Sequence, residues 1–293
     1  MIAFRRGSFI HRAICLVLLT LPLSSYAGVI SSLGTAQDFS LLSLTGGVSQ
    51  SGTSSVQGTI GVAAPLSGYT GSGSIHDPGG FDILTTSTFQ SSATGTSGPV
   101  DQNAQTDTLL LGAKAAASST STLASTAGLV PTASYGLLQN STAISETNKG
   151  DYVFDLSGIN LGGGSTLTLS APAGSTFVLN VGSLLLGGAF NLSSAQIILT
   201  GGLTADDVLW NVLGSGSVNL ASSTVNGIVL ALNRSVNVTG GEVNGELVGG
   251  SISLSGGHVN GPPPVVPEAN TVVVLIPVIG AILFSASRRF LLA

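Results

Sequence analysis

Residues 217–261 read SVNLASSTVNGIVLALNRSVNVTGGEVNGELVGGSISLSGGHVNG, and two short patterns recur in this stretch. One pattern is the triplet Val-Asn-Gly, whose copies are 18 and 16 residues apart, at 225–227, 243–245 and 259–261. The other is Ser-Val-Asn-Leu with its variants, which begins at the same spacing at Ser217, Ser235 and Ser251. Two patterns in one register indicate a structural unit of 16 to 18 residues. That length is too short for a pair of helices and is close to one turn of a β-solenoid.

The contents of one turn follow from the alternation of side chains along a strand. If the aliphatic residues of the repeat point inward, they stack as one apolar column of Val218, Leu220, Val236, Val238, Ile252 and Leu254. Their polar neighbours then point outward in two rows, with about 4.8 Å between turns. These outward residues are the candidate binding residues: Ser217, Asn219, Ser235, Asn237, Ser251 and Ser253.

The Val-Asn-Gly triplet predicts a corner. We expect its valine to point inward and its Asn-Gly pair to turn the chain, because both residues tolerate a positive φ. A third strand, such as residues 228–232, would then return the chain. Three strands and three corners in each turn predict a right-handed triangular β-solenoid. An ordinary β-sandwich is the alternative, but its spacings should be less regular.

Weaker copies of the unit precede this stretch. Short strand-like runs bounded by Gly, Ser or Pro occur at 166–169, 177–181, 190–192, 196–200 and 208–212. Residues 39–62 also read as short strands joined by glycine turns. The solenoid is therefore expected to extend well beyond its most regular part.

Residues 99–127 break the pattern and predict a long helix. Apolar and small residues recur there at helical spacing, at Ala104, Leu111, Ala115 and Thr122, and Gly128 is the expected C′ residue. A helix of about 28 residues would be about 42 Å long. Its Ala-rich stripe would let it lie close along one side of the solenoid.

Composition excludes several classes of protein. Only 7% of the residues are charged, 43% are hydrophobic and 41 are glycine, which argues against a disordered chain and against a helical bundle. Residues 28–266 hold three basic and twelve acidic residues, which leaves a formal charge of −9. Such a charge disfavours binding to nucleic acid. The one cysteine, Cys15, lies in the N-terminal segment, so neither disulfides nor a thiol nucleophile is expected in the body.

The N-terminal segment, residues 1–27, reads as a secretory signal peptide. Three arginines precede a short apolar run at residues 13–23, and small residues precede Gly28, where cleavage is expected. An uncleaved membrane anchor is the alternative, but the apolar run is shorter than the roughly 20 residues that span a bilayer.

The C-terminal segment reads as a sorting tail. A Pro-rich linker with the motif Pro267-Glu268 occupies residues 262–270, and residues 271–293 are an apolar span that ends at Arg288 and Arg289. This order resembles the PEP-CTERM tail of Gram-negative bacteria, although Ala269 stands where a second proline is usual. The resemblance implies recognition by an exosortase-type enzyme, with the helix in the membrane before processing. A plain C-terminal anchor is the alternative.

The body contains an ordered series of motifs: 33–42, 56–62, 150–154, 177–181, 207–212 and 225–232. In this order, and with a helix between the early strands and the main solenoid, residues 33–261 resemble the ice-binding-like β-solenoid family of microbes from cold habitats. Choice-of-anchor A domains share the later half. The resemblance implies ice binding on a flat, often Thr-rich solenoid face, whereas the most regular face here carries Ser and Asn.

Candidate catalytic and metal-binding residues are few. Asp151 and Asp155 would share one face of a strand, and Asp206 and Asp207 would end a turn. Glu242 and Glu246 flank the corner at Asn244-Gly245 and are expected to be solvated. Neither body histidine, His76 or His258, has a partner at metal-ligand spacing. We expect no catalytic residue, no metal and no cofactor.

The sequence therefore predicts an exported, non-catalytic solenoid in the cell envelope, on the surface or in the matrix of a Gram-negative bacterium. Its partner would be ice or ordered water on the Ser/Asn face. A structural or adhesive protein of an exopolysaccharide matrix is the second hypothesis. A polysaccharide lyase or hydrolase that uses Asp151 or Asp155 is the third.

Overall fold

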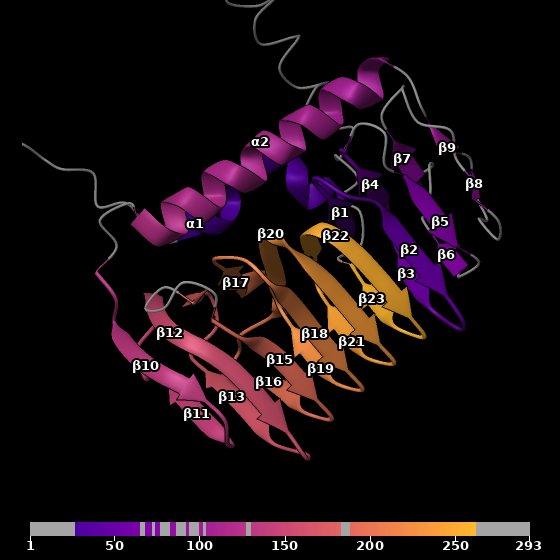
Figure 1. Cartoon of the computed structure of the whole chain (residues 1–293). Coiled ribbons are helices and arrows are strands. Elements are labelled where there is room, and N and C mark those ends of the chain that lie inside the picture. The colour runs from indigo at the N-terminus through magenta and orange to yellow at the C-terminus, as the bar shows by residue number, and fades with distance from the viewer. Residues whose placement is uncertain are drawn as a thin grey trace, which may run out of the picture.

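The structure is a computed structural model, and it describes residues 27–64, 68–71, 74–76, 83–85, 92–93, 100–101, 104–126, 130–182 and 188–261. Most of these residues form short parallel strands that stack turn over turn, with one long helix alongside (Figure 1). Each complete turn adds one strand segment to each of three faces, so the cross-section is triangular. The predicted triangular solenoid with a flanking helix is confirmed.

The first face lies under the long helix and is called the helix-covered face. Its strands are, in spatial order, β10 (Ala133–Leu138), β12 (Asp151–Gly162), β14 (Thr176–Val181), β17 (Val208–Val212), β20 (Ile228–Thr239), β22 (Leu247–Ser255), β1 (Leu41–Ser43), β4 (Ile60–Val62), β7 (Ile83–Thr85) and β9 (Val100–Asp101). The longer strands β12, β20 and β22 continue around an edge onto the second face.

The second face carries the predicted polar rows and is called the asparagine–serine face. Its strands are the second parts of β12, β20 and β22, together with β15 (Phe190–Ser193), β18 (Ser217–Ala221), β2 (Val48–Ser51), β5 (Tyr69–Gly71) and β8 (Ser92–Ala93).

The third face carries a more varied set of side chains and is called the mixed face. Its eight strands are β11 (Thr142–Ser145), β13 (Thr166–Ser170), β16 (Gln196–Thr200), β19 (Thr224–Asn226), β21 (Glu242–Asn244), β23 (His258–Asn260), β3 (Ser55–Gln57) and β6 (Ser74–His76). The strand-like runs predicted at residues 166–169, 177–181, 190–192, 196–200 and 208–212 are all strands here.

The order of turns in space is not their order in the sequence. The stack begins at β10 and β11 and rises to β22 and β23, and the N-terminal strands then continue it. Leu41 of β1 pairs with Leu247 of β22, and Val56 of β3 pairs with Val259 of β23. In Figure 1 the indigo strands accordingly lie beside the yellow ones. The turns formed by residues 41–101 thus extend a ladder that ends at residue 260.

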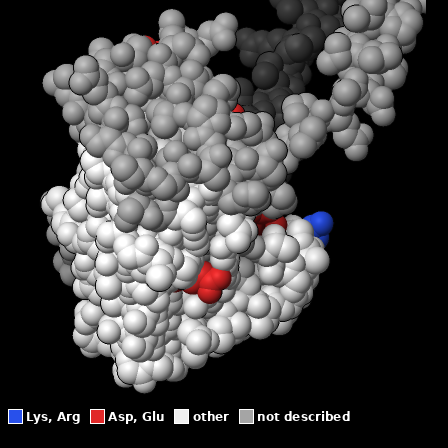
Figure 2. Space-filling model, turned by 90° about the vertical axis from the view of Figure 1, so that its right-hand side faces the viewer, with Lys and Arg blue, Asp and Glu red and all other residues white. Residues whose placement is uncertain are grey.

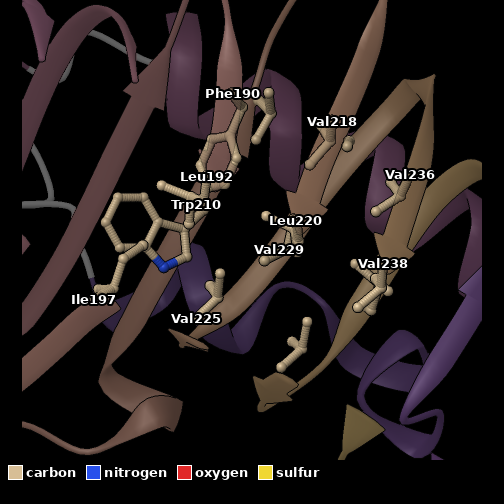
Figure 3. Packing of buried hydrophobic residues seen from close by; sticks show 14 of the residues in the cluster. Phe190, Leu192, Ile197, Trp210, Val218, Leu220, Val225, Val229, Val236 and Val238 are labelled. Atoms are coloured by element: carbon tan, nitrogen blue, oxygen red, sulfur yellow. The ribbon is translucent and has the colours of Figure 1, made fainter. Parts of the chain in front are cut away.

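The interior of the tube is one apolar column. Val218, Val236 and Ile252 lie on adjacent rungs in exact register, and all three are buried, as are Leu220, Val238 and Leu254. Figure 3 shows side chains of neighbouring turns pointing into the same interior space. Trp210 packs edge-on against Phe190, with 5.8 Å between ring centres, and its indole N–H donates to the carbonyl of Asn226 at 3.0 Å. The predicted stacking is confirmed.

A second apolar layer joins the helix-covered face to the helices. Val178, Leu209 and Leu230 point outward from their strands and remain buried, because α2 (Ala104–Thr126), α1 (Ala27–Ser31) and η1 (Gly34–Asp38) pack on them. Strands β14 and β17 are therefore buried on both sides. This arrangement leaves the other two faces without a covering helix.

The predicted helix exists, but its inward stripe was wrongly chosen. Leu111, Ala115 and Thr122 are exposed, whereas the side chains turned to the solenoid are Leu110, Ala113, Ala117, Thr120, Ser121 and Ala124. The reason is polar. Ser121 donates to Asn211 of β17, and this pairing selects a stripe that apolarity alone does not indicate. Gly128, the expected C′ residue, lies outside the described residues.

The corners are built differently from the prediction. Gly227 and Gly245 have positive φ at the corner between the mixed and helix-covered faces, as expected, but Asn226 and Asn244 are strand residues without positive φ. A Cβ on Gly245 would lie 2.6 Å or less from the backbone of Gly227, at 2.4 Å from its carbonyl oxygen. The glycine is required there by close approach, and the asparagine has another role, described below.

No helix among the described residues is long and apolar enough to cross a membrane. The predicted signal peptide lies almost entirely outside the described residues, and the predicted linker and tail (residues 262–293) lie wholly outside them.

Candidate binding face

The predicted binding residues form straight rows on the asparagine–serine face. Ser217, Ser235 and Ser251 lie on successive rungs, and Asn219, Asn237 and Ser253 form a parallel row two residues further along each strand. All six are exposed or half-buried. The local cause is the alternation in each strand, which sends the aliphatic neighbours inward.

The asparagine row is longer than the sequence repeat indicated. It continues in one direction through Asn191 and Asn160, and in the other through Ser49 and Thr70. Sequence reasoning missed these four residues because they lie outside the three best copies of the repeat. The Ile-Asn-Leu and Phe-Asn-Leu runs at residues 159–161 and 190–192 were the available signal.

Hydrogen bonds between rungs order these side chains. The amide of Asn219 donates to Asn191 at 2.8 Å, and the amide of Asn237 donates to Asn219 at 3.0 Å. Ser251 donates to Ser235 at 2.9 Å, and Ser49 donates to Ser253 at 3.1 Å. Each asparagine amide has two donor hydrogens and an acceptor oxygen with two lone pairs. A ladder bond on each side therefore leaves further donor and acceptor capacity for a ligand.

The face has one hollow. Gly47 and Gly68 lie in the row that Ser217, Ser235 and Ser251 begin, and the missing side chains open a depression of about 520 Å³. Its rim carries hydroxyls and one amide, and no charged residue: Ser49, Thr70, Ser235, Asn237, Ser251 and Ser253. The flat face expected from the sequence is thus flat over its asparagine part and hollowed beside its serine part.

The mixed face has a ladder of its own. The amide of Asn244 donates to Asn226 at 3.0 Å, and the amide of Asn260 donates to Asn244 at 2.9 Å. These are the asparagines that were expected to turn corners. The neighbouring row is less uniform, because Thr224, Glu242, His258 and Ser55 follow one another. Ile198 is also exposed on this face, beside a second hollow of about 360 Å³.

The residues considered for catalysis have structural partners or lie apart. Asp155 shares a side of β12 with Asp151 and accepts a hydrogen bond from the buried amide of Asn180 at 3.2 Å. Asp207 accepts from the backbone N–H and the hydroxyl of Thr204 and so closes the turn at η2 (Ala205–Asp207). His258 Nδ1 lies 2.7 Å from the Ser55 hydroxyl on the mixed face. Among the described residues, no group of three His, Cys, Asp or Glu side chains is placed to hold a metal ion.

Glu246 corrects one expectation. It was predicted to be solvated, yet it is 3% exposed, and its Oε2 atom has no hydrogen-bond partner. Burial raises the pKa of Glu246 to about 8, with smaller contributions from the charges of Asp206 and Asp38. Its neighbour Leu247 points into the tube, so Glu246 is turned to the outer side of the helix-covered face, where η1 packs.

Comparison with known families decides the classification. A family profile for the ice-binding-like adhesive domain matches residues 25–261, which is most of the chain. The chain belongs to this family. No curated protein sequence matches it significantly.

Solved structures agree with this assignment at the level of fold. An ice-binding protein with antifreeze activity from an Arctic yeast superposes with a TM-score of 0.58 and 22% identity, over 81% of this chain and 96% of that one. An ice-binding protein from an Antarctic bacterium of the Flavobacteriaceae gives 0.57 and 24%, over 81% of this chain and 48% of the other. One from the Antarctic ascomycete Antarctomyces psychrotrophicus gives 0.53 and 24%, over 78% and 97%. The ice-binding-like adhesive domain of this chain is therefore a β-solenoid of the same type as those proteins.

Proposed function

We propose that this protein is a non-catalytic binding protein whose asparagine–serine face binds ice or ordered surface water. The observation that carries the proposal is the row that runs from Asn160 to Thr70 at one residue per rung. Side chains that are ordered by ladder bonds lose little further freedom on binding, so many weak contacts along a rigid face can add up. Family membership and the ice-binding structural neighbours support the same ligand.

The experiment compares one substitution on the two open faces. Asn237 and Asn244 each lie within an asparagine ladder, the first on the asparagine–serine face and the second on the mixed face. Asn237→Lys and Asn244→Lys therefore make the same chemical change in matched surroundings. We expect ice-recrystallisation inhibition and thermal hysteresis of residues 28–261 to be lost in Asn237→Lys and retained in Asn244→Lys. The reverse result would assign binding to the mixed face, and an inactive, folded wild type would reject ice as the ligand.

A second candidate ligand is a neutral polysaccharide, and the hollow beside Gly47 and Gly68 favours it. Hydroxyl and amide groups without charge line this depression, and they suit the hydroxyls of uncharged sugars. The described acidic residues outnumber the basic ones, which disfavours acidic chains. Figure 2 likewise shows few charged atoms among the described residues of that side of the molecule. Thr70→Tyr should fill the hollow and reduce retention on neutral glycans, whereas Thr168→Tyr on the mixed face should not.

We also propose that the protein is exported and sorted through its two terminal segments. Cleavage before Gly28 would leave Val29 and Ile30, which are buried against the helices, in the mature chain. The mature N-terminus, read by mass spectrometry from the host envelope, should therefore be Gly28. Replacing Pro267 and Glu268 by alanine should leave the C-terminal segment uncut by an exosortase-type enzyme and retain the protein in the membrane. The same mass in both forms would contradict processing at this motif.

A further inference from the structure

One end of the solenoid is formed by β10 and β11, and each of these strands pairs on one side only. Among the described residues, β10 pairs with β12 and β11 pairs with β13, and no described strand lies beyond them. Figure 1 shows both strands at the open end of the stack. Unpaired strand edges of this kind are templates for pairing with another chain.

Natural proteins usually protect such edges with charges, with proline inside the strand or with a bulge. Residues 130–145 contain no Asp, Glu, Lys or Arg, and their one proline, Pro131, precedes β10. The register of β10 against β12 keeps one constant offset from Ala133 to Leu138. None of the usual protections is present along this edge.

Apolar side chains are exposed at the same end. Leu137 is 46% exposed, and Val130, three residues before β10, is 77% exposed. Tyr135 is half-buried and packs on Phe154, with 6.2 Å between ring centres, so the aromatic core approaches the surface here. A second strand laid along β10 would cover these groups as well as the backbone edge.

We propose that this edge pairs with the β10 edge of a second copy of the chain, related by a two-fold axis. A strand can pair with its own copy in the antiparallel sense across such an axis, so one surface supplies both halves of the interface. The chain has a formal charge of −5, so copies repel one another in general, whereas the uncharged edge of residues 130–145 can approach its equal. The interface would join two solenoids end to end and present two asparagine–serine faces in one particle.

The test uses the full chain and measures its molecular mass by sedimentation across a range of concentrations. Wild type should convert from monomer to dimer as concentration rises. Leu137→Lys places a charge on the edge and should raise the dimer dissociation constant by about tenfold or more. Leu111→Lys makes the same change at a residue that is 62% exposed on the outer side of α2, and it should dimerise as wild type does.

A second edge variant guards against misfolding of the first. Gly136 has no positive φ, and no atom lies within 4 Å of the position that its Cβ would occupy, so Gly136→Lys adds a charge to the edge without a clash. It should weaken the dimer as Leu137→Lys does while circular dichroism remains that of wild type. A wild type that stays monomeric, or a dimer that both edge variants leave unchanged, would overturn the proposal. The second outcome would move the contact to another surface.

Discussion

Two amide ladders in this protein have the same geometry and different surroundings. On the asparagine–serine face, Asn191, Asn219 and Asn237 are linked rung to rung at 2.8 and 3.0 Å, and solvent reaches them. On the helix-covered face, the amide of Asn211 donates to Asn180 at 2.8 Å, and both side chains are buried under α2. The first ladder keeps bonding capacity for a ligand.

The buried ladder uses its capacity on the helix. Ser121 donates to Asn211 at 2.7 Å, and Asn180 donates to the carbonyl of Ala124 at 2.9 Å. Removing one member leaves its buried partners unsatisfied, and that costs far more than losing an exposed bond. The comparison teaches that the parallel stack makes ladders wherever asparagines align, and that burial decides whether a ladder binds a helix or remains open.

The largest expected effect is in the buried ladder. Asn211→Ala should lower the free energy of unfolding by about 3 kcal/mol, because the Asn180 carbonyl oxygen and the Ser121 hydroxyl both lose their partner inside a dry contact. Urea unfolding followed by circular dichroism measures the loss. A cost under about 1 kcal/mol would show that the helix is held by its apolar layer alone.

The second expected effect is a pH dependence from Glu246, the other buried polar group of the helix-covered face. Its pKa is about 8 in the folded chain, against 4.5 for the ordinary group, so the folded state holds a proton that the unfolded state has released. Stability should therefore fall as pH rises through this window, by about 2 kcal/mol between pH 6 and pH 8. Glu246→Gln should flatten the unfolding free energy over this range, and an equally steep variant would contradict the assignment.

The third expected effect is small and lies in the open ladder. Asn219→Ala removes two exposed amide bonds and should cost about 0.5 kcal/mol in urea unfolding. A loss as large as that of Asn211→Ala would mean that both ladders are structural. Binding assays on the same variant would then separate ligand contact from folding.

The smallest expected effect lies at the corner that joins the two open faces. Ser194 and Ser222 adopt positive φ there, at 53° and 48°, where other turns have glycine, such as Gly240 at 59°. Ser222→Gly relieves a left-handed residue but adds freedom to the unfolded chain, so these terms nearly cancel. Thermal unfolding should change by no more than about 0.5 kcal/mol in free energy. A larger destabilisation would indicate that the serine side chain contributes to the corner.

Much of the candidate site could be predicted from local pattern. The alternation around Val218, Val236 and Ile252 placed six polar residues on one face, and the structure aligns them in the predicted rows. The hollow at Gly47 and Gly68 could not be predicted, because those glycines join the face only through contacts with residues about 200 positions away. Glu246 was misjudged for the same reason, since the element that packs over it, η1, comes from the other end of the sequence.

The sequence by itself determined the cross-section of this protein. The period of 16 to 18 residues, the inward aliphatic residues and the corner glycines together specify a three-sided turn. Only the tertiary structure decided the order of the turns, in which residues 41–101 stack beyond residue 260 and α2 returns along the face that they share. The physical reason is that parallel backbone hydrogen bonds do not depend on side-chain identity. Any turn with Val or Leu inside can therefore stack on any other, and the packing of the helix selects one arrangement.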